Sequence, residues 1–463
     1  MAKLISADLT NNKLCILEYA TTDGQMLSFK EDAFDAKIVS HTYTDIGKVI
    51  FDKPITEIGD YAFRNCKSLT SVTIPDSVTT IGKSAFSHCY RLTSVTIGNS
   101  VTTIGKWAFS ECKSLTSVTI GNSVTTIGEW TFYGCKSLTS VTIPDSVTTI
   151  GNGAFSECDS LTSVTIPDSV TTIGEGAFEG CDSLTSVTIP DSVTTIGGGV
   201  FAGCKSLKEF NGKFATDNGR CLTIDGVLNA FAIGYGATQY TIPDSVTTIG
   251  FGAFYKCDSL TSVTIPDSVT TIGYAAFSSC GSLKSVTIPD SVTMIGEEAF
   301  YNCSRLTSVT IPDSVTTIGE AAFRDCSRLT SVTIGNSVTT IGGCAFYECR
   351  SLTSVTIGDS VTTIGVNAFR SCTSLISVTI PNGVTTIGDY AFYACTSLTS
   401  VAIGKSVSEI GKKAFKECNI DTIVCYPKIP PKIDDSFSKF ENLIVPTGCE
   451  EAYANSDWGQ HLE

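Results

Sequence analysis

The sequence predicts a repeat solenoid rich in short parallel strands, and three regularities support that prediction. Cysteine recurs every 23 residues from Cys66 to Cys204, and again from Cys257 to Cys418. Phenylalanine keeps the same interval, and so does the pair Ile-Gly. Self-similarity at a fixed period of this size is the signature of stacked repeats, in which each unit buries its apolar face only against its neighbours.

A typical unit covers residues 69–89. Residues 71–74, Ser-Val-Thr-Ile, alternate polar and apolar side chains, which predicts a strand with one buried face. Residues 75–77, Pro-Asp-Ser, predict a turn because Pro presets φ and Asp bonds to the backbone after it. Residues 78–81 return to the core in a second extended piece. Residues 85–89 are expected to form a short helical or 3₁₀ turn that ends near the cysteine.

The repeat divides the chain. We expect residues 1–50 to form a β-rich N-terminal cap, residues 51–418 the solenoid, and residues 419–463 a C-terminal cap, because stacked repeats need ends that cover the core. Within the first segment, Thr21–Gly24 is a hairpin-type turn signal, and residues 38–40 and 48–51 are expected to be strands.

One coil carries an insertion at about residues 211–240. The interval from Cys204 to Cys257 is 53 residues, which is one repeat plus 30 further residues. Phe210 occupies the valine position of the strand, and Tyr240 occupies it again. Tight-turn signals between these two residues predict a β-hairpin or meander that protrudes from the coil. A ligand-gripping loop and a structural spacer both remain open for it.

Composition excludes several partners. The chain has 463 residues, with 31 Lys+Arg against 46 Asp+Glu, and its net charge is −15. This balance argues against nucleic acid and against an anionic membrane surface. No apolar run is long enough for a membrane-spanning helix, so we expect no membrane insertion. The first residues contain no continuous apolar stretch of the kind that an export signal needs.

The repeat resembles a known family. The order Leu-x-x-Val-x-Ile, then Val-x-x-Ile-Gly, then Ala-Phe-x-x-Cys is similar to the BspA-type leucine-rich repeats of bacterial surface proteins, over about residues 55–418. The resemblance implies a right-handed leucine-rich-repeat solenoid with the strands on its concave face. It also implies an adhesin-like or host-protein-binding role at the cell surface or in a secreted form. The missing export signal leaves a cytoplasmic location as the alternative.

The polar and sulfur chemistry of the repeat has mainly structural explanations. We expect reduced, packed thiols at the 15 cysteines of the repeat, because buried cysteine behaves as a small hydrophobe. Aspartate recurs in the turn after the strand, where an Asx turn is expected and calcium binding is the alternative. The outward Ser and Thr of the strands form a hydroxyl surface, which is either solvated or suited to a repetitive ligand.

Signatures of catalysis and metal binding are missing from the sequence. The chain has only 3 His and no Cys/His zinc spacing. It also has no nucleophile elbow, Walker loop or dinucleotide fingerprint. We therefore expect no enzyme activity, no metal and no cofactor.

The residues that vary most between repeats are the pair after Ile-Gly and the pair after Phe. Exposed aromatic side chains are enriched at interfaces, although here they could equally cover the core. The candidate binding surface consists of these aromatic residues: Trp107, Trp130, Tyr133, Tyr255, Tyr274, Tyr301, Tyr347 and Tyr390. We expect any partner specificity to lie at this edge or in the insertion and not on the uniform strand face.

These observations predict a non-enzymatic binding or adhesion protein. It would present its repeat surface to a protein or polysaccharide partner through many weak contacts that sum by avidity. The alternative is a structural spacer or scaffold that has no specific ligand.

Overall fold

The computed structural model describes residues 15–462, and the chain forms two compact units. The first unit holds the described residues up to Leu222 together with Ala232–Tyr235. The second holds Thr223–Phe231 and the described residues from Gly236 onward. The division falls inside the predicted insertion, where the first strand ladder is interrupted: Glu209–Asn211 pairs back to Ser186–Thr188, whereas Gln239–Thr241 pairs with a later strand.

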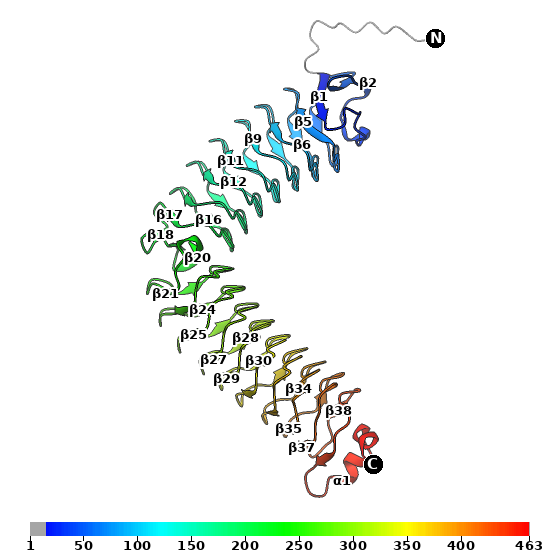
Figure 1. Ribbon diagram of the computed structural model, residues 1–463, viewed down its shortest axis with the longest axis vertical. Helices are drawn as coiled ribbons and strands as arrows, with labels where there is room; N and C mark the ends of the chain where they lie inside the picture. The colour runs from blue at the N-terminus through cyan, green and yellow to red at the C-terminus, as the bar shows by residue number, and fades with distance from the viewer. Residues whose placement is uncertain (1–14, 463) are drawn as a thin grey trace, which may run out of the picture. The chain divides into compact units, whose positions relative to one another are not determined.

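In the first unit each coil contributes two strands to two parallel ladders (Figure 1). Equivalent residues pair across coils, as Val118 does with Val141. Each valine of the Ser-Val-Thr strands is buried while the threonine beside it is exposed, as predicted from the alternation. The first ladder comprises β5 (Leu69–Thr73), β7 (Ser94–Thr96), β9 (Ser117–Thr119), β11 (Ser140–Thr142), β13 (Ser163–Thr165), β15 (Ser186–Thr188) and β17 (Glu209–Asn211). The second comprises β4 (Glu57–Ile58), β6 (Thr80–Ile81), β8 (Thr103–Ile104), β10 (Thr126–Ile127), β12 (Thr149–Ile150), β14 (Thr172–Ile173) and β16 (Thr195–Ile196). Strand pairing is interrupted between β13 and β15 in the first ladder and between β8 and β10 in the second.

The second unit is built in the same way. Its first ladder comprises β21 (Gln239–Thr241), β23 (Ser262–Thr264), β25 (Ser285–Thr287), β27 (Ser308–Ile311), β29 (Ser331–Ile334), β31 (Ser354–Thr356), β33 (Ser377–Thr379), β35 (Ser400–Ile403), β37 (Thr422–Cys425) and β39 (Asn442–Ile444). Its second ladder comprises β20 (Val227–Phe231), β22 (Thr248–Ile249), β24 (Thr271–Ile272), β26 (Met294–Ile295), β28 (Thr317–Ile318), β30 (Thr340–Ile341), β32 (Thr363–Ile364), β34 (Thr386–Ile387), β36 (Glu409–Ile410) and β38 (Lys432–Ile433). Strand pairing in the first of these ladders is interrupted between β31 and β33, whereas it is continuous in the second.

The third side of each coil is an edge of turns, which we call the turn edge. The helical or 3₁₀ turn predicted at residues 85–89 does not form. Two residues in this part of the coil adopt left-handed backbone conformations, Ser84 with φ 53° and His88 with φ 63°, and such residues end a right-handed helix. The turn edge is nevertheless hydrogen-bonded between coils, because the Phe86 N–H donates to the Ala108 carbonyl of the next coil at 2.7 Å.

Phenylalanine and cysteine form continuous columns behind the turn edge. The rings of Phe86 and Phe109 stack with their centroids 5.2 Å apart and their planes 2° from parallel. The Cys112 thiol, fully buried, donates to the Phe86 carbonyl of the preceding coil at 3.2 Å. The packing expected for the cysteines is confirmed, and the same thiol–carbonyl hydrogen bond recurs along the column, a contact that the sequence did not indicate.

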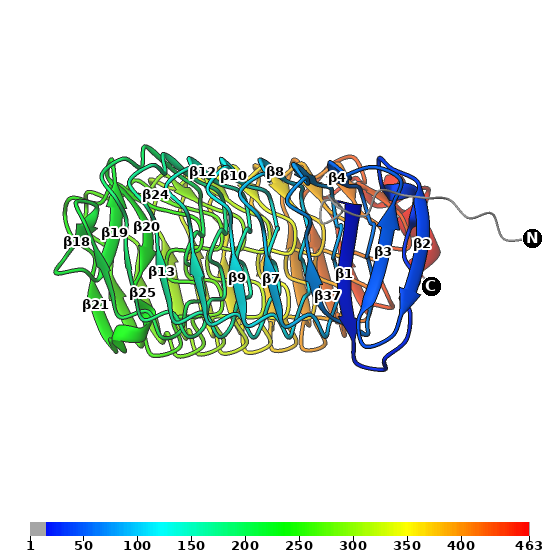
Figure 2. The same cartoon turned by 90° about the horizontal axis from the view of Figure 1, so that it is seen from above.

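The described part of the predicted N-terminal cap, residues 15–50, adds antiparallel strands to the first ladder, and the prediction for residues 1–14 lies outside the described residues. β1 (Ile16–Thr21) pairs with β5 and with β3 (Gly47–Phe51), and β2 (Ile38–Tyr43) pairs with β3 (Figure 2). The strands expected at 38–40 and 48–51 are therefore present. The turn at Thr21–Gly24 does not close a hairpin, however, because β1 and β2 are not neighbours in the sheet.

The solenoid continues beyond Cys418, where the sequence analysis ended it. Phe437 stacks on Phe415 at 5.1 Å, and β37, β38 and β39 extend both ladders. The pattern was missed because the interval between these two phenylalanines is 22 residues instead of 23. The helix α1 (Glu450–Ala454) and a 3₁₀ turn at Asp457–His461 then carry the buried Trp458 against Phe437, at 5.1 Å. No helix among the described residues is long and apolar enough to cross a membrane.

The insertion is only partly a hairpin. β18 (Ala215–Thr216) and β19 (Cys221–Ile224) are antiparallel, as the turn signals indicated. The rest does not protrude as expected, because β20 begins the second ladder of the second unit: Leu228 pairs with Ile249, and the Phe231 ring lies 4.9 Å from Phe254. Its apolar side chains fill positions that a regular coil would fill.

Candidate binding edge

The turn edge places two side chains of each coil in positions where the backbone is left-handed. One position is the second residue after Ile-Gly, which holds Trp107 (φ 62°), Trp130 (φ 56°) and Tyr390 (φ 56°). All three rings lie at the surface and are half-buried. Bulky residues seldom adopt a left-handed backbone conformation, so these rings mark an unusual backbone position.

In the first unit the three predicted aromatic residues form one cluster. The Trp107 and Trp130 rings stack at 5.2 Å with planes 10° apart, and Tyr133 meets both edge-on, at 5.9 and 5.5 Å. The other face of Trp130 covers Gly153, since a Cβ built there would lie 2.2 Å from the indole. Both faces of Trp130 are therefore occupied within the protein, which favours a packing role for this ring over stacking on a ligand.

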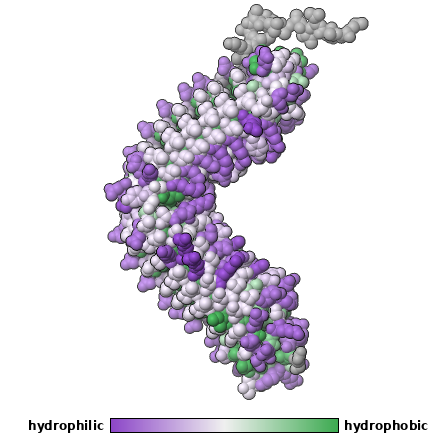
Figure 3. Space-filling view, viewed as in Figure 1, coloured by the Kyte–Doolittle hydropathy of each residue, from purple (hydrophilic) through white to green (hydrophobic). Residues whose placement is uncertain are grey.

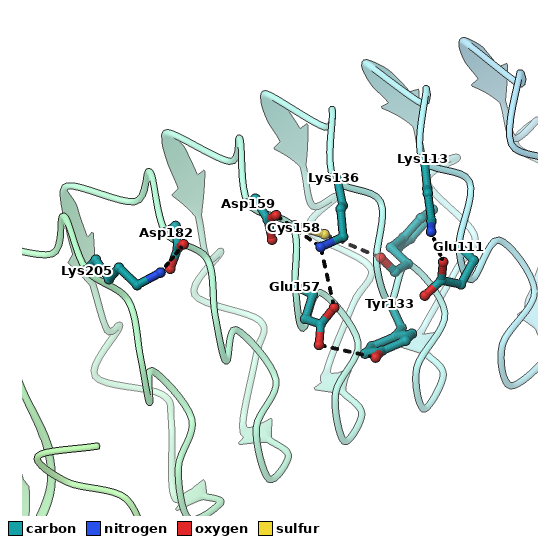
Figure 4. A network of polar contacts seen from close by, with 10 residues as sticks. Glu111, Lys113, Tyr133, Lys136, Glu157, Cys158, Asp159, Asp182 and Lys205 are labelled. Atoms are coloured by element: carbon teal, nitrogen blue, oxygen red, sulfur yellow. Dashed lines mark hydrogen bonds and ion pairs between the residues drawn. The ribbon is translucent and has the colours of Figure 1, made fainter. Parts of the chain in front are cut away.

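Charged residues surround this cluster. Tyr133 donates to Glu157 at 3.3 Å, and Lys136 lies 3.2 Å from Asp159 and 3.8 Å from Glu157 (Figure 4). Burial and then the Glu157 carboxylate raise the pKa of the Tyr133 hydroxyl, which stays protonated at neutral pH. The hydroxyl and its neighbours are thus already paired with one another.

In the second unit, Tyr301 and Tyr347 belong to an alternating series that occupies the position directly after the core phenylalanine. We call it the Tyr–Arg row: Tyr301, Arg324, Tyr347, Arg370 and Tyr393. The Arg324 guanidinium lies 5.7 Å from the Tyr301 ring and 4.8 Å from Tyr347. Arg370 follows in the same way, 5.7 Å from Tyr347 and 5.0 Å from Tyr393. Five successive coils thereby present one continuous cation–π stack.

Tyr390 joins the row from the neighbouring position. Its ring lies 5.6 Å from the Arg370 guanidinium and 5.6 Å from the Tyr393 ring. The two other predicted tyrosines do not join: Tyr255 is covered by the Lys256 ammonium at 4.9 Å, and Tyr274 meets Phe251 edge-on at 4.9 Å.

The sequence analysis missed Arg324, Arg370 and Tyr393 because it selected aromatic side chains one at a time. The signal was present in the sequence. Reading only the position after the core phenylalanine, at intervals of 23 residues, gives Tyr-Arg-Tyr-Arg-Tyr from residue 301 to residue 393.

The strand face is polar and internally hydrogen-bonded. The Thr116 hydroxyl donates to the Thr93 carbonyl of the preceding coil at 3.0 Å, and this contact recurs along the ladder. One aspartate of the turn after the strand makes a contact between coils in place of the Asx turn that we expected: Asp313 Oδ1 accepts from the backbone N–H of Asn336 in the next coil at 2.6 Å. A shallow groove of about 740 Å³ crosses this face in the second unit, between Ser285 and Asp359.

Metal ligands do not gather in the part of the chain that the structure describes. Among residues 15–462, no group of three or more His, Cys, Asp or Glu side chains could hold a metal ion. The repeat cysteines are poor nucleophiles, because burial raises the pKa of Cys303 well above its ordinary value and leaves little thiolate.

Comparison with solved structures finds the same kind of fold. A leucine-rich repeat protein from Eubacterium ventriosum is 24% identical, with 88% of this chain and 95% of that chain covered and a TM-score of 0.56. A leucine rich cell surface protein from Faecalibacterium prausnitzii is 28% identical, with 95% and 97% covered and a TM-score of 0.44. A leucine-rich repeat protein from Bacteroides ovatus is 26% identical, with 88% and 98% covered and a TM-score of 0.44. No curated protein matches.

The family model for the BspA type leucine rich repeat region, which contains 6 copies of the repeat, matches residues 36–148, 102–217, 228–342 and 316–444. These matches span most of both units, and the ladders within them pair equivalent residues of successive repeats. The chain therefore belongs to the BspA-type leucine-rich repeat family.

Proposed function

We propose that this chain is a non-enzymatic binding protein that recognises a protein partner through the Tyr–Arg row. The observation that supports the proposal is the alternation itself. Tyrosine and arginine are two of the three residue types that dominate protein–protein binding energy, and here they occupy five successive coils.

The row is ordered before any partner arrives. Each guanidinium is held between two rings, and the backbone positions that carry it are fixed by hydrogen bonds to the next coil, as from the Asp325 N–H to the Tyr347 carbonyl at 2.8 Å. Immobilising a flexible side chain costs about 0.5–1.5 kcal/mol on binding. Because stacking already restricts the two arginine side chains, their immobilisation on binding costs less.

The geometry favours a protein over a polysaccharide as partner. Sugars are bound by aromatic faces, but the faces of Tyr347 are occupied by Arg324 and Arg370. A partner contacts ring edges, hydroxyls and guanidinium N–H groups, which suit carboxylates and backbone carbonyls. Arg370 Nε is buried and has no hydrogen-bond partner within the described residues, so contact of this arginine with a partner protein would come from its Nη groups, one of which also donates to Asn367 at 3.3 Å.

The test is binding of the full chain to a panel of purified extracellular-matrix and cell-surface proteins, with a glycan array in parallel. The double variant Arg324→Ala/Arg370→Ala should weaken binding to the recognised protein by about tenfold or more, as expected for hot-spot residues. The matched control is Arg305→Ala/Arg328→Ala, which removes two exposed arginines outside the row and should leave affinity unchanged.

Three results would contradict the proposal. Equal losses in both double variants would indicate a general charge effect. Loss of binding only in Trp107→Ala/Trp130→Ala would assign recognition to the first unit. Absence of saturable binding to every protein and glycan would favour the spacer, whose support is the hydrogen bonding that recurs between neighbouring coils within each unit.

A further inference from the structure

The second unit has a groove beside its last coils, which we call the C-terminal groove. It has a volume of about 960 Å³ and runs past the ends of β35, β37 and β39. Apolar residues form most of its surface: Val407, Val424, Tyr426, Ile429, Ile444 and Val445. Figure 3 shows apolar surface near this end of the chain, where Figure 1 places β37 and α1.

Large apolar side chains in the groove are exposed to water. Ile429 is 82% exposed, Ile444 54% and Tyr426 50%. Contiguous exposed apolar surface of this kind marks an interaction site in a folded protein. The groove is also preformed, because Tyr453 donates to the Pro427 carbonyl at 2.8 Å and Trp458 donates to the Pro431 carbonyl at 2.9 Å, which fixes the loop between them.

Every charged residue that lines the groove is a lysine: Lys405, Lys428 and Lys432. None of the ion pairs formed among residues 15–462 involves any of the three. Lys405 occupies the turn position that is Asp or Asn in earlier coils, such as Asp359 and Asn382. In a chain of net charge −15, this reversal of sign creates a local site for an anion.

The groove also borders an unpartnered strand. β39 ends its sheet and pairs only with β37, so its outer backbone groups have no strand partner. An extended peptide can add to such an edge, with main-chain hydrogen bonds giving affinity and side-chain pockets giving specificity.

We propose that the C-terminal groove binds an extended peptide segment of a partner protein, one that alternates apolar and acidic side chains. The segment adds to β39, places its apolar side chains against Ile429 and Ile444, and pairs its carboxylates with the three lysines. A fatty acid would satisfy the apolar surface and the lysines but would leave the edge of β39 unused, which favours the peptide.

The experiment measures fluorescence anisotropy of a labelled synthetic peptide of alternating valine and glutamate, titrated with the full chain. Saturable binding is expected, and added salt should weaken it because exposed charges are screened. The matched probe alternates valine and lysine and should bind at least about tenfold more weakly.

Two pairs of variants locate the site. Ile429→Asp should reduce affinity for the acidic peptide by about tenfold or more, whereas Ile376→Asp, at an isoleucine that is 56% exposed outside the groove, should not change it. Lys428→Glu should also reduce affinity for the acidic peptide by about tenfold or more. Its control is Lys284→Glu, at an exposed lysine outside the groove, which should not change this affinity.

The proposal is overturned if the two peptides bind equally or if the acidic peptide does not bind. It is also overturned if laurate, a fatty-acid anion, displaces the acidic peptide fully and peptide binding does not depend on the edge of β39. That last point is tested with Leu443→Pro, which removes a backbone N–H on the side of β39 that faces away from β37. Arg324→Ala/Arg370→Ala should leave peptide binding unchanged, so this proposal and the Tyr–Arg row succeed or fail separately.

Discussion

At the scale of single residues, one position in the repeat decides what the turn edge presents. The position after the core phenylalanine holds Ser110 in one coil, where the hydroxyl is almost fully buried, and Tyr133 in the next, where the ring is half-exposed. The backbone is the same in both coils. Recognition can therefore change by substitution at this position without disturbing the core columns behind it.

The cysteine column has a chemical consequence at the same scale. Burial raises the pKa of the Cys303 thiol well above its ordinary value, and the S–H donates to the Phe277 carbonyl at 3.2 Å. We expect iodoacetamide to label Cys449, which is half-buried, in the folded protein and to leave Cys303 unlabelled, as read by peptide mass spectrometry. Both should react in denaturant. Equal labelling rates in the folded protein would contradict the packed column.

At the scale of one coil, the glycine after the second strand sets how closely neighbouring coils approach. A Cβ at Gly319 would lie 2.4 Å from the backbone nitrogen of Glu297 in the preceding coil. Backbone atoms that are hydrogen-bonded on three sides of the coil have little freedom to move away. The Ile-Gly pair thus follows the 23-residue period because the coil spacing requires it.

Gly319→Ala should lower the free energy of unfolding by about 1–3 kcal/mol, the usual cost of forcing a group into packed structure. The matched control is Gly281→Ala, where the nearest atom is the Asp258 carboxylate oxygen at 3.3 Å, at the end of a side chain that can rotate. The urea midpoint of each variant checks the difference. Similar midpoints for the two would show that coil spacing does not depend on this glycine.

At the scale of the whole molecule, stability depends on contacts between neighbouring coils that repeat along each unit. Strand hydrogen bonds, stacked phenylalanines and thiol–carbonyl hydrogen bonds all join one coil to the next. The division into two units falls where the insertion interrupts this series. We therefore expect urea unfolding to follow the separate units and not the single two-state transition of one compact core.

The cysteine columns make stability depend on pH. Burial raises the folded-state pKa of Cys66 to about 11 and of Cys257 to about 12, whereas unfolded cysteine has a pKa of about 8.5. Above that pH the unfolded chain releases protons that the folded chain keeps, so this contribution is full below about 8.5 and declines as pH rises.

We expect the urea midpoint to fall on going from about pH 7.5 to about pH 9.5. The variant Cys257→Ala should show a smaller fall, because it has one such thiol fewer. A midpoint that is constant or rises over this interval would contradict the linkage.

Local alternation and a constant interval were enough to predict the repeat, the strand positions, the inward valines and the packed cysteines. The sequence predicted the end of the solenoid at Cys418 too early and the turn edge as helical, because a one-residue change of interval and the left-handed conformations at positions such as Ser84 and His88 leave no compositional mark.

Which side chains meet between coils follows from the folded structure and not from the repeat pattern. Trp130 lies between Trp107 and Gly153, and Arg370 lies between Tyr347 and Tyr393, because stacking places residues 23 apart in contact. The C-terminal groove likewise depends on where the ladders end. Contacts across coils are set by the geometry of stacking, whereas the pattern within a coil fixes only which side chains face the core and which face water.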